Sequence, residues 1–226
     1  MASPRADSGA PEDTGHRGLD TVLFVIDEPR LPSLHPDELN DEQRDVYQAI
    51  VGGPRPANVF SFLDDEGRLL GPFNAMLHSP AVGGPLQELG AALRFRTSFT
   101  KREREIATLV VAARLRSDYE WYAHERIGRR AGLTDAELTA LRTGADPVLA
   151  DARERIVHEV ARTLATDGDL SAPMFTEATA SLGRAAVVEL VTLVGYYSAL
   201  ALQLRVFRVG LPGGETPPSW EPGTAS

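Results

Sequence analysis

The stretch TKREREIATLVVAARLRSDYEWYAHERIGRRAG, residues 100–132, decides the fold of this chain. Thr100 and Glu103 have the spacing of a helix capping box, and apolar residues follow them at intervals of three and four. A second helical segment comes directly after the first and ends before Gly132, a residue type that is common just beyond helix C-termini. We therefore expect two consecutive helices across these residues.

The chain on either side of this stretch has the same helical pattern. Asn40 with Gln43 and Thr134 with Glu137 are two more capping signals, and prolines and glycines make 52–71 a loop. Further helices are predicted at 72–78, from Pro80 onward, and at about 148–166, 171–182 and 184–208. Because no segment alternates between apolar and polar residues as a strand does, we predict an all-α fold.

The two ends of the chain differ from this helical body in composition. Residues 1–20 and 211–226 are rich in glycine, proline and small polar residues, so we expect disordered tails there. The short apolar run 21–26 is either a lone strand or an extended arm that packs on the body or on a neighbouring subunit. A single helical domain is thus expected over residues 21–210.

The amino-acid composition excludes several classes of partner and of chemistry. The 226 residues carry a net charge of -9, which argues against nucleic acid or an anionic membrane as a partner. No cysteine is present, so disulfides, thiolate metal ligands and a cysteine nucleophile are excluded. The N-terminus lacks the apolar core of a signal peptide, and the apolar run 190–204 is shorter than the ~20 residues of a membrane span. We expect a cytoplasmic protein.

Lys101 is the only lysine of the chain, so Schiff-base chemistry would depend on it. It lies beside Arg102 and Arg104 at a predicted helix start, where a solvated basic turn is the simpler interpretation.

A group of polar residues in the stretch 100–132 is suited to proton transfer. Glu120 and His124 are four positions apart and share one helix face, and Ser117 lies one turn earlier. Glu105 belongs to the preceding helix, whose antiparallel course could bring its carboxylate beside His124. A glutamate and a histidine four positions apart on a helix most often form a surface ion pair. Here, however, several aromatic residues lie next to Glu120 and His124 in the sequence, among them Tyr119 and Trp121, which is unusual for a solvent-exposed face. We take Glu105, Ser117, Glu120 and His124 as candidate catalytic residues, and both aromatic residues as candidate substrate contacts.

Asn74 and His78 form a second pair at a spacing of four, in a segment bounded by Gly71-Pro72 and Pro80. They are candidate substrate contacts, although a buried, hydrogen-bonded structural pair fits the same pattern.

These residues carry a resemblance to a known family. Residues 100–141 resemble the core of the carboxymuconolactone decarboxylase-like superfamily, which includes alkylhydroperoxidase D. Redox members have Glu-x11-Cys-x2-Cys-x3-His, and this chain has Glu105-x11-Ser117-x2-Glu120-x3-His124. The resemblance extends over about 30–210 and implies an alkylhydroperoxidase D-like helical bundle that assembles as a homotrimer or a homohexamer. The segment 187–204, apolar nearly all round, gives a physical reason for such assembly.

The two replaced cysteines determine what the resemblance implies for the chemistry. A serine hydroxyl cannot replace the thiolate that attacks a peroxide bond, so thiol peroxidase activity is not expected. The superfamily's lactone decarboxylase uses general acid–base steps without metal or organic cofactor. By that resemblance His124 would be the acid or base, Glu105 would orient it, and Glu120 would be a second proton carrier. Ser117 and nearby helix N–H groups would hold an oxyanion or carboxylate.

Three functions remain open on this basis. The first is a cofactor-independent lyase or isomerase that decarboxylates, isomerises or cyclises a small cyclic carbonyl, lactone or polyketide-like substrate. The arginine-rich composition is typical of bacteria with GC-rich genomes, in which such proteins often serve secondary metabolism. The second is a metal-dependent oxygenase or hydrolase, with His78, His124, Glu105 and Glu120 as ligands. The third is a non-catalytic oligomeric protein that binds a small molecule.

Overall fold

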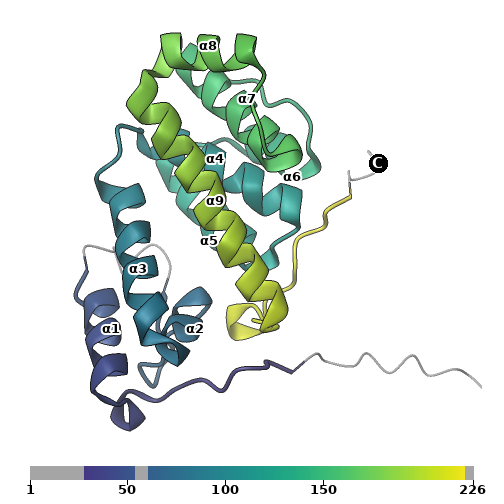
Figure 1. Cartoon of the computed structure of the whole chain (residues 1–226). Helices are drawn as coiled ribbons and strands as arrows, with labels where there is room; N and C mark the ends of the chain where they lie inside the picture. The colour runs from purple at the N-terminus through teal and green to yellow at the C-terminus, as the bar shows by residue number, and fades with distance from the viewer. Residues whose placement is uncertain (1–27, 54–60, 222–226) are drawn as a thin grey trace, which may run out of the picture.

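Helices make up the architecture of this protein. The computed structural model describes residues 28–53 and 61–221, and within those ranges it has nine α-helices, two short 3-10 helices and no strand beyond one isolated bridge, between Leu63 and Leu69. The predicted all-α fold is confirmed (Figure 1). In chain order the helices are η1 (Pro36–Glu38), α1 (Asp41–Val51), α2 (Pro72–His78), α3 (Pro80–Phe95), α4 (Lys101–Leu115), α5 (Asp118–Ala131), α6 (Asp135–Thr143), α7 (Ala152–Asp167), α8 (Ala172–Leu182), α9 (Arg184–Val206) and η2 (Pro212–Gly214).

Local sequence signals set most of the helix boundaries. The three predicted capping boxes are all present, at the N-termini of α1, α4 and α6, where Asn40, Thr100 and Thr134 are the N-cap residues. Helix α7 starts at Ala152, later than expected, because the Asp151 side chain accepts hydrogen bonds from two backbone amides of the first turn.

Helix α4 is the centre of the fold. It packs against α5, α6, α7 and α9, and its Ile106, Leu109 and Val111 side chains are fully buried. Helix α9 crosses α4, and α8 connects α7 to α9 at one end of the molecule (Figure 1). Helices α1, α2 and α3 form a smaller group that contacts α9 through α2 and α3. This arrangement leaves a cavity between α3, α4, α5 and α9.

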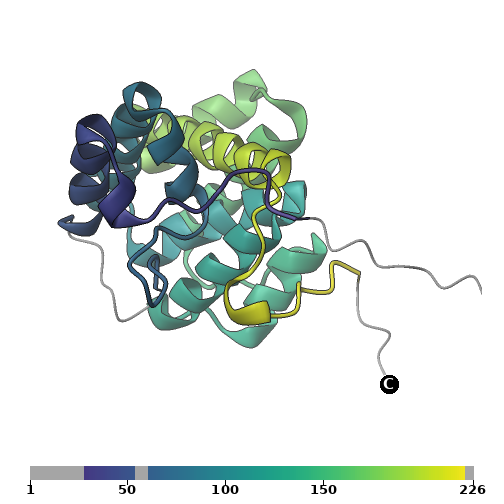
Figure 2. The same cartoon turned by 90° about the horizontal axis from the view of Figure 1, so that it is seen from below.

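The first described residues cross the far end of the last long helix (Figure 2). The backbone N–H of Arg30 donates to the Phe207 carbonyl at 2.9 Å, and its guanidinium donates to the Val206 carbonyl at 3.1 Å. The predicted N-terminal tail and the apolar run 21–26 lie outside the described residues.

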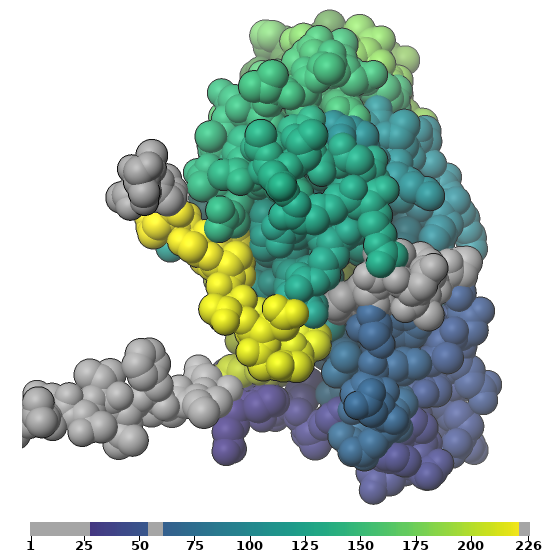
Figure 3. All heavy atoms as spheres, turned by 180° about the vertical axis from the view of Figure 1, so that it is seen from behind, coloured from purple at the N-terminus to yellow at the C-terminus, as the bar shows by residue number. Residues whose placement is uncertain are grey.

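The C-terminal segment runs back along the body after α9 (Figure 3). Although its composition predicts disorder from residue 211, the described part reaches Glu221 and makes specific contacts. The Trp220 indole N–H donates to the Asp118 carboxylate at 2.8 Å, and its ring lies edge-on to Trp121, with 5.7 Å between centroids. The segment is therefore attached at the first residue of α5.

Helix α9 has apolar residues on both its inner and outer faces. Leu190 and Leu193 are fully buried, whereas Val188 and Leu202 are 66% and 61% exposed. Among the described residues, α9 alone is long and apolar enough to cross a membrane, and half of its most apolar window is buried in the fold. Core helices of water-soluble proteins have the same property.

Candidate functional site

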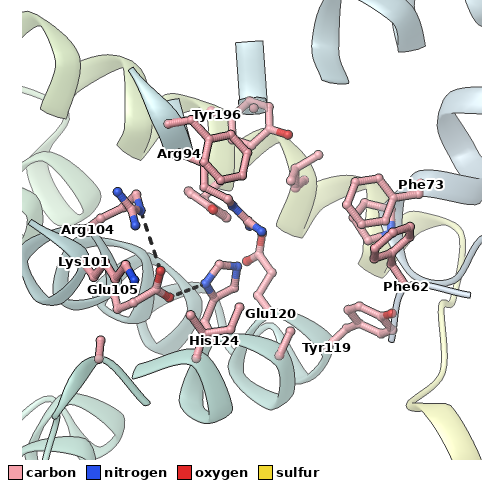
Figure 4. A pocket seen from close by; sticks show the side chains of 18 of the residues that line it. Phe62, Phe73, Arg94, Lys101, Arg104, Glu105, Tyr119, Glu120, His124 and Tyr196 are labelled. Atoms are coloured by element: carbon pink, nitrogen blue, oxygen red, sulfur yellow. Dashed lines mark hydrogen bonds and ion pairs between the residues drawn. The ribbon is translucent and has the colours of Figure 1, made fainter. Parts of the chain in front are cut away.

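A cavity with a volume of about 390 Å³ lies beside the paired acid and base predicted from the sequence (Figure 4). Glu105 of α4 and Glu120 and His124 of α5 all line it, together with Tyr119. Helices α4 and α5 are joined by a very tight turn, in which Arg116 adopts the left-handed conformation at φ 49°. The turn makes the two helices run back along each other and brings Glu105 next to His124.

Glu105 and His124 form a short, buried hydrogen bond. His124 Nδ1 lies 2.6 Å from Glu105 Oε2, and both side chains are nearly inaccessible to solvent. Since an ionised carboxylate can only accept, the imidazole Nδ1–H donates. The imidazole Nε2 is then the nitrogen that remains to exchange a proton with a molecule in the cavity. The Tyr197 ring stands edge-on to the imidazole, with 5.0 Å between centroids, and fixes its orientation further.

The surroundings of Glu105 keep its carboxyl group ionised. Burial by itself raises the pKa of this group, but the charge of His124 and the hydrogen bond from it act in the opposite direction. The positive charges of Arg94 and Arg104 add to this effect, so the pKa of Glu105 lies below its ordinary value. A charged Glu105 stabilises an imidazolium at His124.

Glu120 has the opposite environment. The residue is 3% exposed, and among the described residues the Ser117 hydroxyl is the one polar group near its carboxyl oxygens, without the geometry of a good hydrogen bond. Burial therefore raises the pKa of Glu120 to about 8, and the nearby hydroxyl of Ser117 offsets only a small part of this increase. At neutral pH this carboxyl group is largely protonated and can donate a proton or a hydrogen bond.

Ser117 does not reach the cavity, contrary to its predicted role of holding an oxyanion or carboxylate there. It occupies the N-cap position of α5, but its side chain does not cap the helix, and its buried hydroxyl lies near the Glu120 carboxyl group instead.

Three predicted substrate contacts also lie away from the cavity. Trp121 points to the opposite side of α5, where it packs against Trp220. Asn74 accepts a hydrogen bond from the Leu34 N–H and donates one to the Pro32 carbonyl, and His78 Nε2 lies 2.9 Å from the same carbonyl. These two residues hold the N-terminal segment; they are hydrogen-bonded, as the structural interpretation of the pair predicts, but only partly buried.

The predicted metal ligands do not converge. His78 is engaged with the N-terminal segment and does not line the cavity that contains His124. In the ranges 28–53 and 61–221, no three histidine, aspartate or glutamate side chains are grouped as a metal site requires. A metal site built from His78, His124, Glu105 and Glu120 is therefore contradicted by where His78 lies.

Several lining residues were not predicted from the sequence. Four are cationic, and Lys101, expected to be only a solvated turn residue, is one of them: Arg94, Lys101, Arg104 and Arg130. Others are apolar or aromatic: Phe62, Phe73, Tyr196 and Tyr197. No local sequence signal shows that Phe62, Phe73 or Arg94 faces the cavity.

Two glycines allow the aromatic walls to form. Gly71 has a φ of 64°, and a Cβ there would lie 2.4 Å from the Tyr119 ring. A Cβ on Gly90 would lie 2.2 Å from the Tyr196 hydroxyl. Larger residues at either position would displace a side chain that lines the cavity.

The chain is similar to known proteins in both sequence and fold. A model of the carboxymuconolactone decarboxylase family matches residues 80–163, which include the Glu105–His124 pair. An uncharacterized peroxidase-related protein from Ralstonia eutropha JMP134, described as an alkylhydroperoxidase AhpD core, superposes with a TM-score of 0.64 at 14% identity, over 80% of this chain and 91% of that chain. A peroxidase-related protein from Silicibacter sp. TM1040 gives a TM-score of 0.61 at 14% identity, over 87% and 95%.

A third similar structure is that of a debrominase. A cysteine-to-alanine variant of the debrominase Bmp8, in complex with 2,3,4-tribromopyrrole, has a TM-score of 0.62 at 12% identity, over 82% of this chain and 95% of that chain. No curated protein matches the sequence significantly. The resemblance inferred from the sequence is thus confirmed by the family match and by the shared fold.

Proposed function

Because residues 80–163 match the carboxymuconolactone decarboxylase family and the fold resembles that of alkylhydroperoxidase D-like proteins, we propose that this chain is an enzyme that processes a small molecule by general acid–base catalysis. The expected substrate is a small cyclic carbonyl compound or lactone, and the reaction is a decarboxylation, isomerisation or cyclisation. The observation that carries this proposal is the 2.6 Å contact between His124 and Glu105 in a cavity that also holds the buried carboxyl group of Glu120.

The arrangement suits the formation and collapse of an enolate. His124 Nε2 would take a proton from the carbon next to the substrate carbonyl, while Glu105 stabilises the imidazolium that results. The neutral carboxyl group of Glu120 would donate to the carbonyl oxygen as negative charge develops there. Return of the proton from His124 to another carbon of the enolate would complete an isomerisation.

The same groups can support a decarboxylation without an added electron acceptor. The bond between the carboxylate and the neighbouring carbon breaks, CO₂ leaves, and the electron pair moves into the enolate. Glu120 again donates to the enolate oxygen, and His124 in its protonated form delivers a proton to the carbon. Electrons and protons balance in this sequence with the substrate, the two side chains and water.

The residues around Glu105 and His124 support catalysis over a role in ligand binding alone. A non-catalytic pocket has no need for two carboxyl groups held in opposite protonation states. The absence of cysteine separates this chemistry from thiol-dependent peroxide reduction. The debrominase with the same fold is described in complex with a small aromatic ring, a ligand of the size that this cavity would hold.

Deuterium exchange provides the test. Enzyme treated with a chelator would be incubated in D₂O with cyclic β-keto acids and enolisable lactones, and exchange and CO₂ loss followed by NMR. We expect catalysed exchange or loss with wild type, and a rate lower by about 10²–10⁴-fold for His124→Ala. Glu125→Gln, which alters a partly exposed carboxylate of the same helix, is the matched control and should behave as wild type. Equal rates for wild type and a folded His124→Ala protein would contradict the proposal.

A further inference from the structure

A second cavity lies between α4, α6, α7 and the C-terminal segment. Its volume is about 530 Å³, and it shares no lining residue with the first cavity, which contains His124. Trp220 of the C-terminal segment forms part of its wall. A cavity of this size is within the range of sites that hold small organic ligands.

The charged groups that line the second cavity are mostly cationic. Four arginines line it, against the single carboxylate of Asp167: Arg114, Arg116, Arg142 and Arg162. This excess of positive charge contrasts with the net charge of -9 of the whole chain. A cavity lined in this way attracts anions and raises their local concentration.

Two of these arginines are not neutralised by any carboxylate of the protein. Arg114 makes no ion pair or hydrogen bond with a residue of the described ranges. Arg142 donates a hydrogen bond to the carbonyl oxygen of Ser219 at 2.6 Å, and because this acceptor is uncharged, the guanidinium keeps its full charge. Both cations are therefore available to an anionic ligand.

The other two arginines take part only in weak surface ion pairs. Arg116 lies 3.4 Å from Glu221, and Arg162 lies 3.8 Å from Asp146. The carboxylate side chains are 77% and 82% exposed, so water competes for both pairs. Exposed pairs of this kind contribute little free energy, and a ligand could replace them at small cost.

A buried histidine in the wall is the second observation that indicates a ligand. His158 of α7 lines the cavity, is 8% exposed, and has no hydrogen bond or ion pair within residues 28–53 and 61–221. Burial and the charge of Arg162 lower the pKa of His158, and Asp146 offsets this only in part, so the imidazole is neutral at neutral pH. A neutral imidazole has one donor and one acceptor nitrogen, and buried groups of this kind are normally hydrogen-bonded. A ligand in the cavity would supply the missing partner.

We propose that the second cavity binds a small phosphate ester that carries a flat ring, such as a nucleoside diphosphate, with its phosphates at the arginines and its ring against Trp220. Guanidinium groups bind phosphate oxygens through paired, charge-assisted hydrogen bonds. Several arginines at one site favour a ligand with more than one negative charge, and an indole ring offers a surface on which a base can stack. This binding site is independent of the chemistry proposed at His124.

Calorimetric titration of the full chain, in buffer without divalent cations, tests the ligand class. The probes are ADP, adenosine, which lacks the phosphates, and inorganic pyrophosphate, which lacks the ring. ADP should bind at least about tenfold more tightly than either of the other two. Raised salt should weaken the binding of ADP and pyrophosphate more than that of adenosine. No binding of ADP, or equal affinity for ADP and either other probe, would overturn the proposal.

Variants of the lining arginines test where the phosphates bind. A protein with both Arg114→Ala and Arg162→Ala should bind ADP about tenfold more weakly or worse, with an unchanged circular dichroism spectrum. Arg184→Ala, an exposed arginine at the start of α9, is the matched control, and Lys101→Ala removes a cation of the first cavity. Both should bind ADP as wild type does. An unchanged affinity in the double variant, or an equal loss in Lys101→Ala, would contradict the proposed site.

NMR of the histidine side chains locates the bound nucleotide directly. His158→Gln and His124→Ala identify the resonances of the two imidazoles by their loss. Addition of ADP to wild type should shift the resonances of His158 and leave those of His124 in place, because His158 lines the second cavity and His124 lines the first. A shift at His124, or none at His158, would show that ADP does not bind in the second cavity. Neither result affects the turnover expected of wild type or of His124→Ala, so the two proposals fail separately.

Discussion

Glu105 and Glu120 line the same cavity, yet their environments shift the pKa values of their carboxyl groups in opposite directions. Glu105 has His124 as a direct partner and two arginines nearby, while Glu120 is buried with no charged partner in the described part of the chain and only the Ser117 hydroxyl nearby. One carboxylate can therefore stabilise positive charge while the other carboxyl group supplies a proton. Such divergence within one pocket is typical of acid–base sites.

Stability should depend on pH through Glu120. Burial raises the pKa of this group from 4.5 to about 8, so between these pH values the folded protein holds the proton more tightly than the unfolded chain. The free energy of unfolding should therefore decrease by a few kcal/mol as pH rises through that range, at roughly 1.4 kcal/mol per pKa unit. Glu120→Gln should remove most of this slope in urea unfolding measured from pH 5 to 8.5, while Glu125→Gln should retain it. An unchanged slope in Glu120→Gln would show that this carboxyl group is ionised at neutral pH.

Glu105→Gln tests the charge of the pair separately from its shape. The amide oxygen still accepts a hydrogen bond from His124 Nδ1, but the negative charge beside the imidazole is lost. We expect a fall of about 10²-fold in the deuterium-exchange rate, smaller than that of His124→Ala, with the circular dichroism spectrum unchanged. A rate within twofold of wild type would mean that the carboxylate only positions the ring.

The C-terminal attachment should contribute to stability. Trp220→Ala removes the edge-on contact with Trp121 and the hydrogen bond to Asp118, and should lower the free energy of unfolding by about 2 kcal/mol. Trp220→Phe keeps a ring but no donor, and should recover part of that loss. Thermal unfolding should rank the three proteins in stability as wild type, then Trp220→Phe, then Trp220→Ala. Identical unfolding transitions would mean that the side chain at position 220 does not contact α5 in solution.

Hydroperoxide reduction should be absent. The chain has no cysteine, and Ser117 and Glu120 occupy the positions of the cysteine pair in redox members of the superfamily. Purified, metal-free protein should consume no cumene hydroperoxide above background with dithiothreitol as reductant. Turnover that depends on the amount of protein would require a different mechanism of O–O cleavage.

Self-association is expected through α9. The exposed side chains of Val188 and Leu202 lie on the outer face of this helix, and a second copy of the chain could cover them. Light scattering at micromolar concentration should give a trimer or a hexamer, and Val188→Glu with Leu202→Glu should shift the mass towards the monomer. Val148→Glu, at a highly exposed position in a loop, serves as the control. A monomeric wild-type protein would rule this assembly out.

The sequence allowed much of the fold and the central pair to be predicted because both depend on local patterns. Thr100, Asn40 and Thr134 mark helix starts through hydrogen bonds within three residues, and the structure has each of them. The contact of Glu105 with His124 crosses only one tight turn. Antiparallel neighbours on consecutive helices are the simplest tertiary contact to anticipate.

Contacts between distant segments could not be predicted in the same way. Arg94 and Phe73 line the cavity from helices α3 and α2, whose orientation depends on their packing against α9. The residues next to them in the sequence do not indicate that either side chain faces a cavity. The spacing of Asn74 and His78 would also suit two residues that line a pocket, but both side chains contact the N-terminal segment instead. Trp121 belongs to the aromatic group beside His124, yet helix geometry directs it to the other side of α5.

The central position of α4 has a consequence for the order in which backbone amides exchange with solvent. Helix α4 is enclosed by α5, α6, α7 and α9, whereas α1, α2 and α3 make most of their contacts with one another. Local opening should therefore begin in the smaller group, and the amides of α4 should exchange last, close to global unfolding. The wall that carries Glu105 and His124 would remain intact while the wall that carries Arg94 and Phe73 separates from it, which gives a partly enclosed cavity a route for ligand exchange.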